Sequence, residues 1–106
     1  MPKYLIQASY TAEGLKGLQK DKASGRKAAV SQAVEGLGGR IDAIYYAFGD
    51  HDAVLILDLP DNVSASAFSL AVSASGFVRT KTTPLLTVEE TDKALQKSVT
   101  YRAPGK

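Results

Sequence analysis

Two neighbouring segments of the sequence are apolar on both of the sides that a β-strand would present. They are residues 40–48 (RIDAIYYAF) and residues 53–59 (AVLILDL), which carry β-branched and aromatic residues at successive positions. Side chains of a strand alternate between its two faces, so a sheet with one face in water alternates apolar with polar residues. These segments do not alternate in that way. We therefore expect both faces of their sheet to be covered.

Two further strands and a hairpin are predicted around this pair. Residues 3–10 alternate as a first strand, with Tyr4 and Ile6 on one side and Leu5 on the other. Residues 77–83 form a last strand that ends before a proline. The four residues 49–52 are enough to close a hairpin between the second and third strands.

Helical patterns follow the first and third strands. Thr11 supplies a cap for the first helix, and Gly38-Gly39 ends it. Asp61 or Ser64 caps the second, which Gly76 stops. A capping box in residues 87–90 (TVEE) opens a short last helix. The last helix is expected to carry Val88, Leu95 and Val99 on one stripe.

The order strand, helix, strand, strand, helix, strand predicts an α+β, ferredoxin-like fold. Both helices then lie on one face of a four-stranded antiparallel sheet, and the other face stays bare. Each large apolar side chain left in water forfeits about 1.5–3 kcal/mol. The short last helix is too narrow to cover four strands. We therefore expect a homodimer whose bare sheet faces pack together as a dimeric α/β barrel.

Length and composition limit the remaining possibilities. A chain of 106 residues predicts one domain over residues 1–100 with a loose tail at 101–106. It has no cysteine, no long apolar run and a net charge of +2, so we expect no disulfide, no membrane contact and no nucleic-acid partner. A cytoplasmic location follows as the default expectation. No metal-ligand cluster or phosphate-binding loop is present, so we expect no metal and no cofactor.

Four blocks of sequence also carry a family resemblance. KYLIQASYTAEG, YAFGDHDAVLILDLPDN, ASGFVRTKTTPLLTVEE and SVTYRAPGK follow one another along almost the whole chain. Together they resemble the GYD domain family, small bacterial and archaeal proteins of the dimeric α/β-barrel superfamily. The resemblance implies a ferredoxin-like fold and a dimer, and it supplies no catalytic residues. The family's Gly, Tyr, Asp pattern falls at Gly49-Asp50-His51-Asp52, with His51 where the tyrosine is expected.

We interpret this hairpin mainly as a turn. Gly49 suits a backbone with positive φ, and Asp50 and Asp52 can accept hydrogen bonds from amides within the turn. His51 has a pKa range suited to general acid–base chemistry, but a lone histidine on a hairpin is more often a surface or packing residue.

Polar side chains on the first and last strands are the better ligand candidates. Gln7 and Ser9 stand among apolar residues, and Arg79 and Lys81 project on one side of the last strand. If that side faces the dimer interior, the two cations can hold a carboxylate, phosphate or phenolate. If it faces water, they protect an edge strand, which is the alternative we favour.

The first helix contains an anomaly. An unbroken helix would place Lys22 and Arg26 on the apolar stripe with Leu15 and Leu18. Burial of unpaired charges is too unfavourable for this. Either the helix breaks within residues 21–25, with Ser24 capping a second segment, or both stems reach out of a cleft. We favour the break, which would lie beside a pocket.

The sequence is compatible with two main classes of function. It also does not exclude a third, regulation through protein contacts. The first is a homodimer that binds a small organic molecule or anion, in the barrel or under the helices. The second is a cofactor-independent enzyme, oxygenase- or isomerase-like, in which Tyr45 or Tyr46, His51 and Arg79 polarise an aromatic or carbonyl substrate. No nucleophile and base pair is recognisable, so we favour binding.

Overall fold

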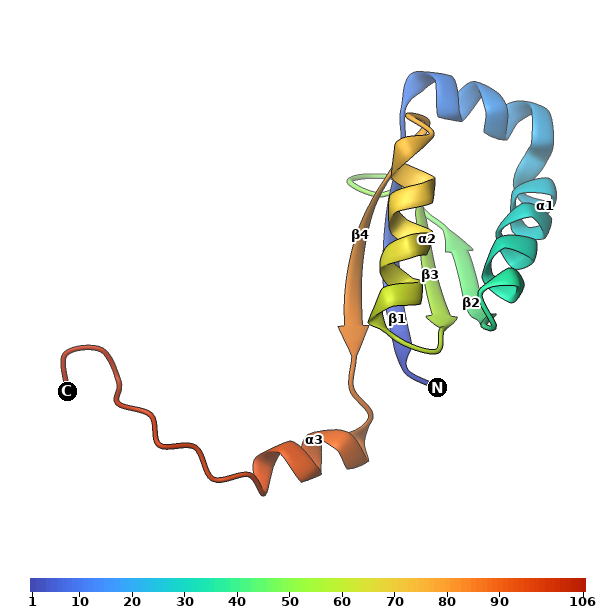
Figure 1. Cartoon of the computed structure of the whole chain (residues 1–106). Coiled ribbons are helices and arrows are strands. Elements are labelled where there is room, and N and C mark those ends of the chain that lie inside the picture. Colours follow the sequence, from blue (N-terminus) through green and yellow to red (C-terminus); the bar gives the residue numbers. More distant parts are fainter.

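The computed structural model describes all 106 residues and contains one four-stranded antiparallel sheet and three helices (Figure 1). In chain order the elements are β1 (Lys3–Tyr10), α1 (Ala12–Gly36), β2 (Arg40–Tyr46), β3 (Ala53–Asp58), α2 (Asn62–Ala74), β4 (Val78–Leu85) and α3 (Val88–Leu95). The strands lie in the order β2-β3-β1-β4, so β1 and β3 are central and β2 and β4 are edges. The predicted α+β, ferredoxin-like arrangement is confirmed.

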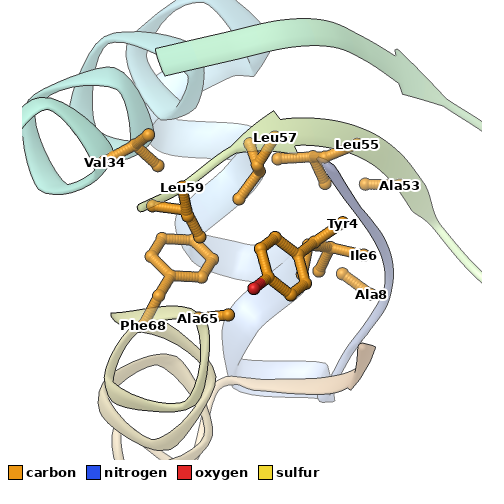
Figure 2. Packing of buried hydrophobic residues seen from close by; sticks show 10 residues of the cluster. All are labelled: Tyr4, Ile6, Ala8, Val34, Ala53, Leu55, Leu57, Leu59, Ala65 and Phe68. Atoms are coloured by element: carbon orange, nitrogen blue, oxygen red, sulfur yellow. The ribbon is translucent and has the colours of Figure 1, made fainter. Parts of the chain in front are cut away.

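One side of the sheet, the helix face, carries the core beneath α1 and α2 (Figure 2). Tyr4 and Ile6 of β1 lie opposite Leu57 and Leu55 of β3, and all four side chains are buried. The whole core cluster is Tyr4, Ile6, Ala8, Val34, Ala53, Leu55, Leu57, Leu59, Ala65 and Phe68. Burial of each large member contributes about 1.5–3 kcal/mol. The Tyr4 hydroxyl donates to Asn62 Oδ1 at 2.7 Å, so its polar end is satisfied.

The opposite side of the sheet, the open face, has no helix over it. Cross-strand partners share a face, and Leu5 of β1 lies opposite Ile56 of β3 and Thr83 of β4. By the same register the open face consists of Lys3, Leu5, Gln7, Ser9, Arg40, Ala43, Tyr45, Val54, Ile56, Asp58, Arg79, Lys81, Thr83 and Leu85. The sequence-based conclusion that one sheet face carries apolar side chains without cover from the helices therefore holds in the structure.

A charged cluster occupies one end of the open face. Asp58 is 3% exposed, and its carboxylate accepts from Lys3 Nζ at 2.8 Å and from Arg40 Nε at 2.8 Å. Lys3 Nζ also donates to Asp42 Oδ2 at 3.0 Å. The Lys3 ammonium and the Arg40 guanidinium hold the pKa of the Asp58 carboxyl below its usual value. Both cations reach solvent, so only the carboxylate is buried.

A β-bulge in β2 changes which residues face the helices. The pairing shifts between Ile41, which lies opposite Leu57, and Ala43, which lies opposite Ile56. The extra residue, Asp42, puts Ile41 on the helix face and Ala43 on the open face. Regular alternation through residues 40–48 would put Ile41 and Ala43 on one side, and the bulge makes that expectation wrong at this point.

Three strand ends also differ from the prediction. β2 ends at Tyr46 rather than at residue 48, and β3 ends one residue early at Asp58. β4 runs through Pro84, which lies opposite Tyr4, instead of stopping before it. A proline is compatible with β4 because an edge strand leaves alternate amides without a ladder partner.

The first helix is interrupted at one residue. Lys22 has φ 65° and ψ 167°, a conformation that costs a non-glycine residue on the order of 1–3 kcal/mol. Figure 1 shows α1 as two segments that meet at a corner. The predicted break within residues 21–25 is confirmed. However, Ser24 lies inside the second segment and is not its first residue.

Residues 86–106, here called the arm, leave the end of β4. Thr87 and Glu90 form the predicted capping box, and α3 buries none of its side chains. In Figure 1 the arm stands clear of the sheet and of the other helices. Val99 lies beyond the helix, so the predicted stripe is reduced to Val88 and Leu95. The radius of gyration is 16.8 Å, where a compact chain of this length has about 13 Å.

Candidate functional site

A cleft lies between α1 and α2, next to the end of β1 and the start of β4. We call it the interhelical cleft, and its volume is about 490 Å³. Its apolar wall includes Leu18, Ala33, Phe68, Ala71, Val72, Phe77 and Val78, and its polar groups are Tyr10, Glu13, Asp21, Arg26 and Ser75. A smaller void of about 50 Å³ continues it down to the helix face, where Tyr46 and Thr80 join the lining. Ligand sites are commonly apolar pockets with a few convergent polar groups, and this cleft has that composition.

The cleft exists because α1 packs against the core only near its C-terminal end, where Val30 and Val34 contact the cluster. Val34, near the C-terminal end of α1, is its single member of the core cluster, whereas α2 contributes Ala65 and Phe68. At the other end of α1, Gly14 is buried so closely that a methyl group there would overlap the carbonyl oxygen of Phe77. The corner at Lys22 lies between these two anchored ends. The middle of α1 is therefore held away from α2.

Arg26 enters the cleft from the second segment of α1. Its side chain is 32% exposed, and Nη1 lies 3.7 Å from Asp21 Oδ2 across the corner of the helix. A loose, partly exposed ion pair of this kind contributes little to stability. Most of the guanidinium donors are thus free to bind an oxygen atom of a ligand.

Tyr46 supplies a hydroxyl at the floor of the cleft. Partial burial of the side chain, which is 37% exposed, together with a hydrogen bond to the side chain of Tyr10, raises the pKa of Tyr46 to about 12. The phenol stays protonated at neutral pH, so it is a neutral hydrogen-bonding group and not a base. Tyr46 and Arg26 line the same inner void, so both polar groups belong to one site.

The structure divides the sequence-predicted site residues between two faces. Gln7, Ser9, Tyr45, Arg79 and Lys81 belong to the open face, where Gln7 lies opposite Lys81 and Ser9 opposite Arg79. Whether any of them binds a ligand stays a prediction.

Tyr46, in contrast, belongs to the helix face, opposite Ala53. His51 lies in the loop between β2 and β3. Tyr46 and Arg79 are thus on opposite sides of the sheet. A catalytic site that contains Tyr46, His51 and Arg79 together is therefore wrong, whereas the alternative with Tyr45, which shares the open face with Arg79, stays a prediction.

The hairpin is closed by a hydrogen bond from the Ala47 amide to the Asp52 carbonyl at 2.8 Å, and it is also tied to β1. Gly49 has a φ of 130°, a region that glycine adopts without strain. The Asp52 carboxylate accepts from the Tyr10 amide at 2.8 Å, and the Ser9 hydroxyl donates to the Asp50 carbonyl at 3.0 Å. The expectation that Asp52 bonds within the turn is therefore wrong, because its side chain lies beside the end of the neighbouring strand.

Tyr10 and Arg26 were not among the predicted site residues. Tyr10 continues the buried side of β1 and looks like a core residue in the sequence. The position of Arg26 on the apolar stripe of α1 did point to an irregularity in the sequence. It implied either a break in the helix or a cleft that admits the side chain. The predicted break occurs at Lys22, and of the two cations only Arg26 lines the cleft.

Other kinds of site find no support in the geometry. No three or more His, Cys, Asp or Glu side chains gather in a group that could hold a metal ion. None of the three helices has the length and apolar character needed to cross a lipid bilayer.

Comparison with known proteins gives one match. The family model described as the GYD domain matches residues 4–95. No curated protein and no solved structure matches the chain.

Proposed function

From its membership of the GYD domain family, to which this chain belongs, and from the two surfaces described above, we propose that the protein is a homodimer that binds a small organic molecule. The open faces of two copies pack together, and the interhelical cleft of each copy holds the ligand. The observation that carries the binding function is the convergence of Arg26 and Tyr46 on an otherwise apolar floor. The ligand is a mainly apolar molecule with one acceptor oxygen, such as a carboxylate, carbonyl or phenolate.

The accessible surface of the subunit supports assembly. The chain exposes 7557 Å², whereas a compact monomer of 11.2 kDa exposes about 5,700 Å². The excess is about 1,900 Å² per subunit. Obligate homodimers bury about 2,000–5,000 Å² in total, so an excess of this size on each of two copies fits that class. Tyr45, 71% exposed on the open face, is one of the side chains that a second copy would cover.

Substitution of Ile56 by aspartate is expected to turn the dimer into monomers. Ile56 lies on central strand β3 of the open face, opposite Leu5 and Ala43, so a face-to-face contact would bury the new carboxylate without a partner. Tyr45→Asp should act in the same way, and its exposure makes misfolding of the subunit an unlikely cause. The measurement is sedimentation velocity at micromolar concentration. Ala29→Asp, on an exposed part of α1, is the control.

Two results would count against the face-to-face contact. One is a monomeric parent protein at micromolar concentration. The other is an Ile56→Asp protein that stays dimeric while its circular dichroism is unchanged.

Ligand binding is tested with the aromatic anion anilinonaphthalene sulfonate, whose fluorescence rises in apolar sites. Arg26→Gln is expected to raise its Kd about tenfold or more, because a hydrogen bond to a charged group is worth about 1.5–3 kcal/mol. Ala71→Trp should abolish binding by filling the cleft. Lys27→Gln makes the same charge change on an exposed neighbour that does not line the cleft, and should leave the Kd unchanged.

Equal affinity in the parent, Arg26→Gln and Ala71→Trp proteins would reject the interhelical cleft as the binding site. A parallel loss in Lys27→Gln would show that general positive charge, and not Arg26, attracts the probe. The dimer contact would be untouched by either result, since it is measured separately.

A further inference from the structure

The arm presents five large apolar side chains to solvent within a short segment. Leu86, Val88, Leu95, Val99 and Tyr101 are each 65–79% exposed. Single exposed apolar residues are ordinary on protein surfaces, but a contiguous group of them marks an interaction site. The sheet and helices of the same subunit do not cover them, since α3 has no buried residue. These apolar side chains can therefore be buried only by a molecule other than their own subunit.

The local sequence specifies α3 as a helix before any contact is made. The Thr87 hydroxyl accepts from the Glu90 amide at 3.0 Å, and the Glu90 carboxylate accepts from the Thr87 amide at 2.9 Å. An isolated helix of eight residues is nevertheless marginal in water, and packing of its apolar stripe supplies most of its stability. Val88 and Leu95 form that stripe, and the 100° step per residue places Glu89 and Asp92 along one border of it.

Charges on the arm and on β4 are complementary and unused. Glu89 and Asp92 form no ion pair within the subunit, and neither do Arg79 and Lys81. Arg79 lies near the start of β4, whereas the arm leaves from the end of that strand, about 20 Å away at 3.3 Å per residue. Figure 1 shows the arm directed away from its own strand. The two pairs of charges cannot meet within one subunit in this arrangement.

We propose that the arm docks on β4 of a second copy of this chain. Val88 and Leu95 pack at the border of the other copy's open face, and Glu89 and Asp92 pair with Arg79 and Lys81 of the partner subunit. A two-fold axis that runs across the strands brings the end of one β4 to the start of the other, and it makes the exchange reciprocal.

The arm is part of the surface that the subunit exposes in excess of a compact monomer, because every residue from 86 to 106 is exposed. Charged pairs at the border of an apolar contact set its register and its specificity more than its affinity. Arg79 and Lys81 are then neither a ligand site nor simple protection of an edge strand. They select the correct partner.

The absence of cysteine from the chain permits a direct test by disulfide trapping. One full-length chain carries Asp92→Cys and a second, with a longer tag, carries Lys81→Cys. They are mixed, briefly destabilised with mild urea to exchange subunits, returned to native buffer and oxidised. The expected product is a disulfide-linked heterodimer, at several times the yield obtained with Ala94→Cys in place of Asp92→Cys. The exposed Ala94 lies on the side of α3 opposite Asp92 and serves as the matched control.

Two outcomes would overturn the proposal. The first is no heterodimer above the Ala94→Cys level. The second is an internal disulfide in a monomeric chain that carries both Asp92→Cys and Lys81→Cys, which would place the arm on its own strand. The test is independent of the face-to-face contact, because a cross-link that persists in an Ile56→Asp background would show arm exchange without packing of the open faces.

Discussion

Replacement of Gly14 by alanine is expected to lower the free energy of unfolding by about 3 kcal/mol, as for severe overpacking of a buried site. The added methyl group would overlap the carbonyl oxygen of Phe77, which is backbone and cannot rotate away. The same carbonyl accepts a hydrogen bond from the Thr11 amide at 2.9 Å. The start of α1 would have to move away from the connection between α2 and β4, and that bond would be lost with it.

Gly17 provides the matched control one turn later in the same helix. A methyl group there meets no atom within 4 Å, so Gly17→Ala should raise stability by up to about 1 kcal/mol through helix propensity. Both proteins are unfolded in urea and followed by far-ultraviolet circular dichroism at one fixed concentration, because the stability of a dimer depends on concentration. Equal shifts of the urea midpoint in the two proteins would show that the close approach at Gly14 is not tight.

Asp58→Ala is the second large effect expected, with a loss of about 2–3 kcal/mol at neutral pH. The substitution removes two hydrogen bonds to charged donors, Lys3 Nζ and Arg40 Nε, both at 2.8 Å. Asp42→Ala is the control, since the Asp42 side chain is 40% exposed and contacts only the Lys3 ammonium of this cluster. Its removal should change stability by less than about 1 kcal/mol.

The pH dependence of this loss follows from the pKa of Asp58. The hydrogen bond from Lys3, and then that from Arg40, lowers the folded-state pKa below the ordinary value of 3.8. The unfolded state consequently binds the proton more readily, so the stabilisation is complete above that value and disappears as the pH falls through the folded pKa. Urea unfolding of the parent and of Asp58→Ala should give free energies whose difference shrinks progressively as the pH falls below 3.8. A difference that stays constant from neutral pH to the lowest pH at which both proteins fold would mean that the charge is not the source.

Local signals in the sequence were sufficient to predict most of the fold. Thr11, Asp61 and Thr87 cap the three helices as expected, and each cap depends only on residues within one helical turn. The period of two in β1 separated the residues of its two sides correctly because that strand has no bulge. The order of elements then left few topologies to choose from.

The features that were missed depend on residues distant in sequence. The bulge at Asp42 accompanies an ion pair with Lys3, which is 39 positions away. The strand could continue through Pro84 only because β4 is an edge. The interhelical cleft reflects the distance between two helices, and no periodicity within either helix encodes that distance. The position of Arg26 on an apolar stripe was the one local feature of the sequence that indicated the cleft.

The five tyrosines lie in different parts of the molecule, so their absorption can report on each part separately. The chain has five tyrosines and no tryptophan. Two of the tyrosines share the cleft, and each of the other three lies in a separate environment. Tyr4 is in the core, Tyr10 and Tyr46 line the cleft, Tyr45 is on the open face and Tyr101 is on the arm. Replacing each tyrosine singly by phenylalanine would therefore show how much each location contributes to the near-ultraviolet spectrum. Folding of the core, ligand binding in the cleft, packing of the open faces and docking of the arm would then be observable as separate optical signals in unlabelled protein.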